Sequence, residues 1–357
     1  MKHILTILVA MLALGSYASE PFSADSVFSE KASSTIVQAD SIHEVKKSWM
    51  TRFLDYFNDA NKNKKHKRFD FSVIGGPHYA SDTKFGLGMV AAGLYRADVN
   101  DSILPPSNVS LFGDVSTVGF YMLGVRGNHL APQGRYRIDY HLYFYSFPSD
   151  FWGMGFEMGD NDDNKSDMKR WQAQVEASFL IKVADNFYVG PMAAYDYVIG
   201  KQIERPELLQ GMDKHTWNVG AGVSLVYENR DNLTNPHRGI YLNIKQMFRP
   251  KFMGNDYAFS STKFRFDAYQ RLGKGTILAE DFGANFNFGN PSWGMMAELG
   301  GTSSMRGYYE GRYRDKHSLE ATVELRQHVW KRNGIVVWAG AGTVFPKFSA
   351  IDRKSVV

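Results

Sequence analysis

From residue 69 onward, apolar residues recur at every second position, which is the period of a β-strand with two unlike faces. Residues 215–228 show this pattern most clearly. One face of the segment carries Trp217, Val219, Ala221, Val223, Leu225 and Tyr227. The other face carries Asn218, Gly220, Gly222, Ser224 and Glu228. The same division recurs in residues 171–179, 276–288 and 319–329, so these strands have one apolar and one polar face.

The alternation predicts about thirteen strands, which lie at residues 69–80, 84–96, 108–117, 119–130, 134–147, 168–183, 186–200, 215–229, 239–250, 257–272, 275–289, 317–331 and 334–346. Most reach about ten residues, which is enough for a tilted strand to cross a membrane. Trp217 and Tyr227 lie at the ends of the apolar face, where the aromatic girdles of membrane strands lie. A soluble β-sandwich would also alternate, but we favour the membrane because of these two features and the N-terminal sequence described below.

Membrane strands must close into a barrel, because lipid offers no partner to an unpaired backbone group. The predicted fold class is therefore all-β, a transmembrane antiparallel β-barrel at residues 69–350. Single-chain bacterial barrels have even strand numbers, so a count of thirteen means either a misjudged hairpin or an incomplete chain.

The N-terminus has the three parts of a secretory signal peptide. Lys2 and His3 are basic, residues 4–14 are apolar, and Ser16 and Ala18 are the small residues that precede a cleavage site. An N-terminal anchor is the alternative, but the apolar run is too short to span about 30 Å of hydrocarbon. We predict a signal peptide at residues 1–18, and no later run is long enough for a membrane helix.

Residues 19–68 read as a periplasmic linker with one short amphipathic helix at 41–58. Ser41 and Glu44 form a capping box, and apolar residues at helical spacing follow it. This helix either lies on a membrane surface or barrel mouth, or serves only in packing.

The composition agrees with two-faced strands more than with a soluble core. Aromatic residues make up 14% of the chain, with 25 Phe and 19 Tyr, yet the mean hydropathy is only −0.33. The net charge of +4 decides little, and we interpret the basic run at 62–68 as a solvated or lipid-facing segment, with no nucleic-acid partner. The chain has no cysteine, so no disulfide framework is available.

Two short motifs suggest a family. Residues 305–315 contain the triplet Arg306, Gly307 and Tyr308 in a long predicted loop, and a predicted hairpin carries Arg230, Asp231, Pro236 and Gly239. The first resembles the Arg-Gly-aromatic loop of the BamA/TamA family, also called bacterial surface antigen barrels. The second is similar to the hairpin pattern of that family. The resemblance covers residues 69–348, and the order of the two motifs makes it more specific than either alone.

This resemblance implies a barrel of sixteen strands, with the Arg-Gly-aromatic loop between strands eleven and twelve. Eleven of our predicted strands precede that loop and two follow it. The resemblance also implies that the loop folds into the lumen, where Arg306 meets the carboxylate of Glu324 on the next strand. The position of a further family aspartate is Gly340 here, so one of the anchors that the resemblance implies for the loop is missing.

The C-terminal residues differ from the aromatic-ended final strand that closes such barrels. Residues 352–357 read Asp-Arg-Lys-Ser-Val-Val, which a common sequencing adapter encodes in frame, so we expect 351–357 to be a non-native tail. On this interpretation the barrel is truncated by three strands. Two lipid-exposed edges would then remain, and we expect that the chain as printed does not insert stably.

The leading prediction for function is a BamA/TamA-like barrel of the assembly and translocation superfamily, integral to the outer membrane of a Gram-negative bacterium. Residues 19–68 are too short for even one POTRA domain, so the part that handles clients in this family is absent from the printed chain. The expected partners are outer-membrane lipid, lipopolysaccharide, and periplasmic or outer-membrane proteins. The alternative is a passive channel or structural barrel, lined by charges such as Glu320, Arg326 and Lys263.

We expect neither an enzyme nor a cofactor. A barrel-embedded lipid hydrolase is the second alternative, but the G-x-S-x-G motif is missing. The histidines and serines that alternate with apolar residues fit polar barrel positions better than a catalytic site; they include His141, His215, Ser146 and Ser224. The acidic loop at 161–164 is best explained as solvated, with a calcium site as its alternative.

Overall fold

The computed structural model describes residues 69–80, 83–98, 106–233, 235–301, 305–331 and 333–351. The predicted signal peptide at 1–18, the helix at 41–58 and the tail from 352 onward lie outside the described residues. The predictions made for these three segments are therefore not tested by the structure.

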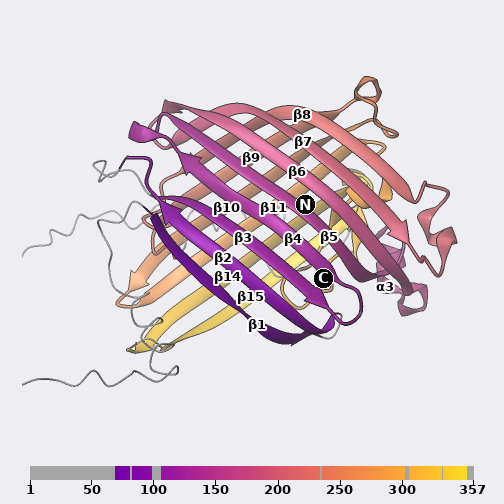
Figure 1. The fold of residues 1–357 in the computed structure, drawn as a ribbon, viewed down its shortest axis with the longest axis horizontal. Helices are drawn as coiled ribbons and strands as arrows, with labels where there is room; N and C mark the ends of the chain where they lie inside the picture. The colour runs from indigo at the N-terminus through magenta and orange to yellow at the C-terminus, as the bar shows by residue number, and fades with distance from the viewer. Residues whose placement is uncertain are drawn as a thin grey trace, which may run out of the picture. The chain divides into compact units, whose positions relative to one another are not determined.

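The described chain forms one antiparallel sheet of thirteen strands, in which each strand pairs with its neighbour in chain order (Figure 1). The strands are β1 (Phe69–Ala80), β2 (Lys84–Tyr95), β3 (Ser107–Ser116), β4 (Tyr121–Leu130), β5 (Tyr136–Phe151), β6 (Ser166–Ala184), β7 (Phe187–Lys201), β8 (His215–Glu228), β9 (Gly239–Arg249), β10 (Phe259–Gly273), β11 (Thr276–Gly289), β14 (His317–Trp330) and β15 (Asn333–Phe345). The predicted count and order are thereby confirmed, with eleven strands before the long loop and two after it.

The short elements lie in the connections between the strands, except for η6, which follows β15. Two strands of two residues each, β12 (Ala297–Glu298) and β13 (Arg314–Asp315), pair to form a separate sheet. The helical turns are α3 (Phe156–Asp160), η1 (Pro132–Gly134), η2 (Asp162–Asn164), η3 (Pro206–Leu209), η4 (Lys251–Met253), η5 (Trp293–Met295) and η6 (Phe348–Ala350). No helix in the described part of the chain has the length and apolar character needed to span a bilayer.

One predicted strand end differs clearly from the structure. The strand predicted at 134–147 continues to Phe151, although Pro148 interrupts its alternation, because its last residues still pair with β6 up to Phe151 opposite Ser166. The barrel was expected to be incomplete, and within the described residues no hydrogen-bonded pairing joins β15 to β1. These two strands are therefore the edges of the sheet.

The sheet is curved, and its concave side is polar. Lys245 of β9 lies 2.5 Å from Glu176 of β6, three strands away. In a flat sheet, strands three apart would be separated by about 14 Å. The ion pair is therefore possible only if the sheet bends around these side chains, and we call the concave side the lumen.

The burial pattern is the reverse of that in a soluble protein. On β8, Trp217 and Val223 are 43% and 49% exposed on the convex side. The alternating residues Thr216 and Asn218 are fully buried on the lumen side. A soluble sandwich would bury the apolar face against a second sheet, whereas here that face is open to its surroundings. Apolar residues that face lipid and polar residues that face a lumen are the arrangement of a membrane barrel.

Connections alternate between the two ends of the sheet. The two-residue turns after β6, β10 and β14 and the hairpin at 229–238 lie at one end. The longer connections at 152–165, 202–214, 250–258 and 290–316 lie at the other. In outer-membrane barrels, short turns face the periplasm and long loops face the outside, so we assign the second end to the cell exterior.

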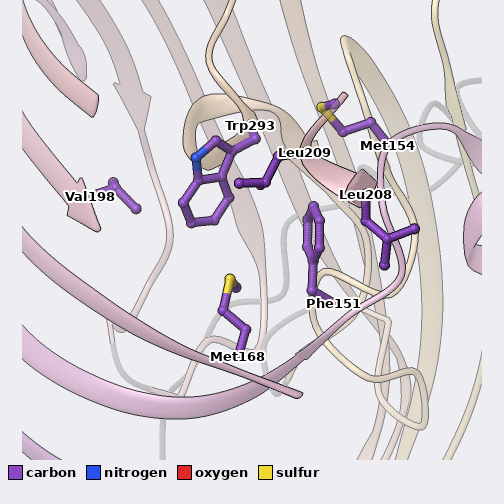
Figure 2. Packing of buried hydrophobic residues seen from close by; sticks show 7 residues of the cluster. All are labelled: Phe151, Met154, Met168, Val198, Leu208, Leu209 and Trp293. Carbon is purple, nitrogen blue, oxygen red and sulfur yellow. The ribbon is translucent and has the colours of Figure 1, made fainter. Parts of the chain in front are cut away.

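The main apolar cluster lies at this second end, where strand ends meet the long connections. Figure 2 shows its side chains packed together. Phe151 from the end of β5 meets Trp293 edge to face, with ring centroids 5.9 Å apart. The buried members of the cluster are Phe151, Met154, Met168, Val198, Leu208, Leu209 and Trp293. They come from the ends of β5, β6 and β7, from the connections at 152–165 and 202–214, and, through Trp293, from the loop at 290–316. The cluster therefore packs this loop against the neighbouring connections and strand ends.

Candidate functional site in the lumen

The loop at 290–316 forms the candidate site together with the lumen wall. Its two arms pair as β12 and β13, and the backbone N–H of Leu299 donates to Tyr313 O at 3.0 Å. Gly300 takes a φ of +103°, and a Cβ there would lie 2.8 Å from Tyr308 O. Only glycine fits this position without strain, so it shapes the loop that presents Arg306.

The structure brings the predicted residues Arg306 and Glu324 together. Arg306 Nη2 donates to Glu324 Oε2 at 2.6 Å, and the guanidinium lies 5.0 Å from the centroid of the Trp338 ring. Glu324 is 8% exposed, on the lumen face of β14. Its other oxygen, Oε1, accepts from Arg326 Nε at 2.6 Å. One carboxylate therefore serves two arginines, one from the wall and one from the loop.

The other residues of the loop motif act on the loop itself. Gly307 has a φ of +106°, which favours glycine, and Tyr308 meets Tyr313 with centroids 6.2 Å apart. Gly340, where the family resemblance placed an aspartate, faces this loop. A Cβ at Gly340 would lie 3.3 Å from Met305 Sδ, so glycine leaves room for a loop side chain.

The hairpin motif lies at the opposite end of the sheet and stabilises the turn between β8 and β9. Asp231 Oδ1 accepts from the backbone N–H groups of His237 at 2.9 Å and Arg238 at 3.3 Å. Partial burial opposes the charged form, but these two hydrogen bonds and the neighbouring positive charges lower the pKa of Asp231. Pro236 is buried within the same turn.

Arg230 and Gly239 complete the motif. Arg230 forms a two-point contact with Glu228, at 2.7 and 2.6 Å, and stacks over the Tyr241 ring at 4.5 Å. Gly239 has a φ of +107°, and a Cβ there would lie 2.6 Å from Asn229 O. The four residues of the hairpin motif thus have structural roles in the hairpin. The loop motif and the hairpin motif lie at opposite ends of the sheet.

A second ion cluster of the loop was missed at the sequence level. Glu298 Oε1 accepts from Arg170 Nη1 of β6 at 2.8 Å and lies 3.2 Å from Arg314 Nη1. Burial works against a charged Glu298, but the two guanidinium groups lower its pKa. Arg170 also donates to the backbone oxygen of Gly294 at 3.1 Å. The loop part of this site lies on β12 and β13. Each of these strands has only two residues, which is too short for an alternating pattern to be recognised in the sequence.

Polar side chains also line a cavity of about 350 Å³ in the lumen. Its lining includes Lys245, Lys263, Arg265, Asn285, Glu298 and Glu320. Two predicted channel residues, Lys263 and Glu320, thus face the cavity, whereas Arg326 pairs with Glu324.

The residues considered for a catalytic or calcium-binding site are not grouped into one. His141 lies 4.0 Å from Glu176, and His215 is exposed on the convex side of β8. Asp162 of the acidic loop pairs with Arg312 at 2.9 Å, and the Asn161 side chain caps η2. Among the described residues, no three His, Cys, Asp or Glu side chains are grouped to hold a metal ion.

Comparison with known proteins agrees with this geometry. A family model described as the Omp85 superfamily domain matches residues 130–355, which is more than half of the chain. No curated protein sequence matches the chain. Among solved structures, BamA from Haemophilus ducreyi lacking POTRA domains 1–3 matches with a TM-score of 0.52 and 14% identity, over 78% of this chain. CdiB from Escherichia coli matches with a TM-score of 0.51 and 12% identity, over 81% of this chain. The chain spans 58% and 54% of those two chains, and at such identities the likeness concerns the fold.

Proposed function

We propose, from the premise that the chain belongs to the Omp85 superfamily, that it works in the insertion or translocation of proteins at the outer membrane. Members of this superfamily are integral β-barrel proteins of the outer membrane of Gram-negative bacteria, and they act as insertases or transporters. The partners we propose are other outer-membrane or periplasmic proteins, with lipid and lipopolysaccharide as the surrounding phase.

The observation that carries this proposal is the loop at 290–316 in the lumen, with Arg306 against Glu324. A loop that fills the lumen keeps an inserted barrel impermeable to solutes. A client strand is then inserted by backbone hydrogen bonding along the sheet, as in any antiparallel strand pair. This work needs backbone pairing and no covalent chemistry, so we propose a protein that is not an enzyme.

The test is the insertion of a second barrel. Full-length protein is placed in vesicles of phosphatidylethanolamine and phosphatidylglycerol, and an unfolded outer-membrane barrel protein is added. Insertion is followed by the faster gel migration of the folded client before boiling. We expect insertion several-fold faster than in empty vesicles, and an equal rate in both would overturn the proposal.

A variant pair links that activity to the loop. The double substitution Arg306→Gln and Glu298→Gln removes the ion contacts of the loop with the strands β14 and β6 and is expected to abolish the acceleration. Glu157→Gln, an exposed carboxylate of α3 at the same end of the sheet but outside both contacts, is the matched control and should retain it. If the double variant inserts the client as fast as the original protein, the loop has no part in the activity.

A passive channel is the second candidate, and the polar cavity of about 350 Å³ is the observation that favours it. The loop argues against it, because it occupies the same lumen. Planar-bilayer recording separates the two: steady conductance with no acceleration of client insertion would favour the channel. An ester-hydrolysis signal in the same preparation would favour the lipid hydrolase instead.

A further inference from the structure

We infer that the lumen loop is held chiefly by a clamp on the wall opposite to Glu324, formed by Arg170, Glu298 and Arg314. This clamp joins β6 to the β12–β13 hairpin, whereas the Arg306–Glu324 pair joins the tip of the loop to β14. The inference deepens the proposed function, since it names the residues that position the loop on which that function depends.

The first argument is burial. The side chains of Arg170, Glu298 and Arg314 are 12%, 19% and 3% exposed. The side chain of Arg306 is 41% exposed. Charge pairs that are open to water are screened by salt and hold little, whereas pairs shielded from water are screened much less.

The second argument is what each pair leaves behind when it breaks. If Arg306 departs, Glu324 still accepts from Arg326 at 2.6 Å, so no buried charge is left alone. If Glu298 departs, the two buried guanidinium groups of Arg170 and Arg314 lose their shared ion pair. The carboxylate of Glu310 acts on both of them, but only from beyond ion-pair distance. An uncompensated buried charge is the costly outcome, so the clamp resists opening more than the pair at the tip.

The third argument is the additional contacts around the clamp. Arg170 also donates to Gly294 O, and Arg314 Nε donates to Gly311 O at 3.0 Å. Each arginine lies over an aromatic ring of the apolar cluster: Arg170 is 5.9 Å from the Trp293 centroid and Arg314 is 4.8 Å from the Phe151 centroid. Charge, backbone and cation–π contacts thus converge on one end of the loop.

The chain contains no cysteine, which allows a direct test with single reporter thiols. Ala297→Cys reports on the clamp, since Ala297 is fully buried beside Glu298, and Met305→Cys reports on the tip, since Met305 is 4% exposed beside Arg306. The full-length protein in vesicles is treated with a water-soluble maleimide, and the labelling rate at each position is measured. No client protein is present, so this result does not depend on insertion activity.

We expect Glu298→Gln to raise the labelling rate at position 297 at least tenfold. Arg306→Gln should change that rate less than twofold, and so should the matched control Glu157→Gln on the exposed side of α3. Gel migration before boiling monitors the fold of every variant. Equal effects of Glu298→Gln and Arg306→Gln at position 297 would overturn the inference.

Salt supplies a second measurement that needs no charge substitution, in case Glu298→Gln fails to fold. At 1 M salt the Debye length falls to about 3 Å, so the exposed Arg306 pair should weaken while the buried clamp holds. We expect labelling at position 305 to rise several-fold and labelling at position 297 to stay unchanged. A rise at 297 equal to that at 305 would contradict the clamp, and a failure of client insertion alone would not.

Discussion

Gly239→Ala tests whether the hairpin motif exists for the geometry of its own turn. Gly239 has a φ of +107°, and an added Cβ would lie 2.6 Å from Asn229 O and 2.7 Å from Arg230 Cα. A positive φ costs a residue with a side chain about 1–2 kcal/mol. Relieving an overpacked contact adds about 1–3 kcal/mol. We therefore expect Gly239→Ala to lower the free energy of unfolding by roughly 2–5 kcal/mol.

Gly254→Ala is the matched control. Gly254 also has a positive φ, +87°, but a Cβ there would meet nothing within 4 Å. Gly254→Ala should cost only the free energy of the positive φ, about 1–2 kcal/mol. The measurement is urea unfolding of each variant in lipid vesicles, followed by tryptophan fluorescence. If the two substitutions cost the same, the close approach of Gly239 to the 229–230 backbone contributes nothing and our reasoning is wrong.

Three further predictions test the reversed polarity, the buried charges and the hairpin carboxylate. Val223→Lys, on the convex face of β8, should destabilise the inserted protein by about 2–4 kcal/mol in urea unfolding, whereas Phe252→Lys in an exposed turn should be neutral. Arg249→Ala strands the buried carboxylate of Asp196 and should cost about 3–5 kcal/mol; adding Asp196→Ala should restore part of this loss, and a further loss would refute the pairing. Because the pKa of Asp231 is lowered in the folded protein, its contribution to stability is present above pH 3.8 and is lost as the pH falls below it. The stability gap between the original protein and Asp231→Asn should therefore shrink below pH 3.8, and a gap that widens there would contradict the two hydrogen bonds.

The strands were predictable from the sequence because lipid imposes a rule on every second residue. The boundaries of β8 and β11, predicted at 215–229 and 275–289, agree with Glu228 and Thr276 to within one residue. The end of β5 was not predictable in this way, because its pairing with β6 continues past the point where the alternation fails. Periodicity reports what faces lipid, and it says nothing where a strand extends beyond the bilayer.

The same limit explains which ion contacts the sequence could reveal. Arg326 and Glu324 are two residues apart on one strand face, so the strand period alone places them together. Arg265 and Asp281 lie on adjacent strands, two residues from direct opposition, and the register of one hairpin predicts their contact.

Arg306 and Glu324 required more than the period, because one of them comes from a loop; only the resemblance to a family with the same motif suggested the contact. For Arg170 and Glu298, neither the strand period nor the family resemblance indicated a contact. Their contact depends on the curvature of the sheet and on the path of a loop across the lumen, and each arises from many residues together. In a protein whose apolar residues face outward, such contacts across the lumen take the place of a hydrophobic core. The interactions that matter most for positioning the loop are therefore the ones that local sequence patterns reveal least.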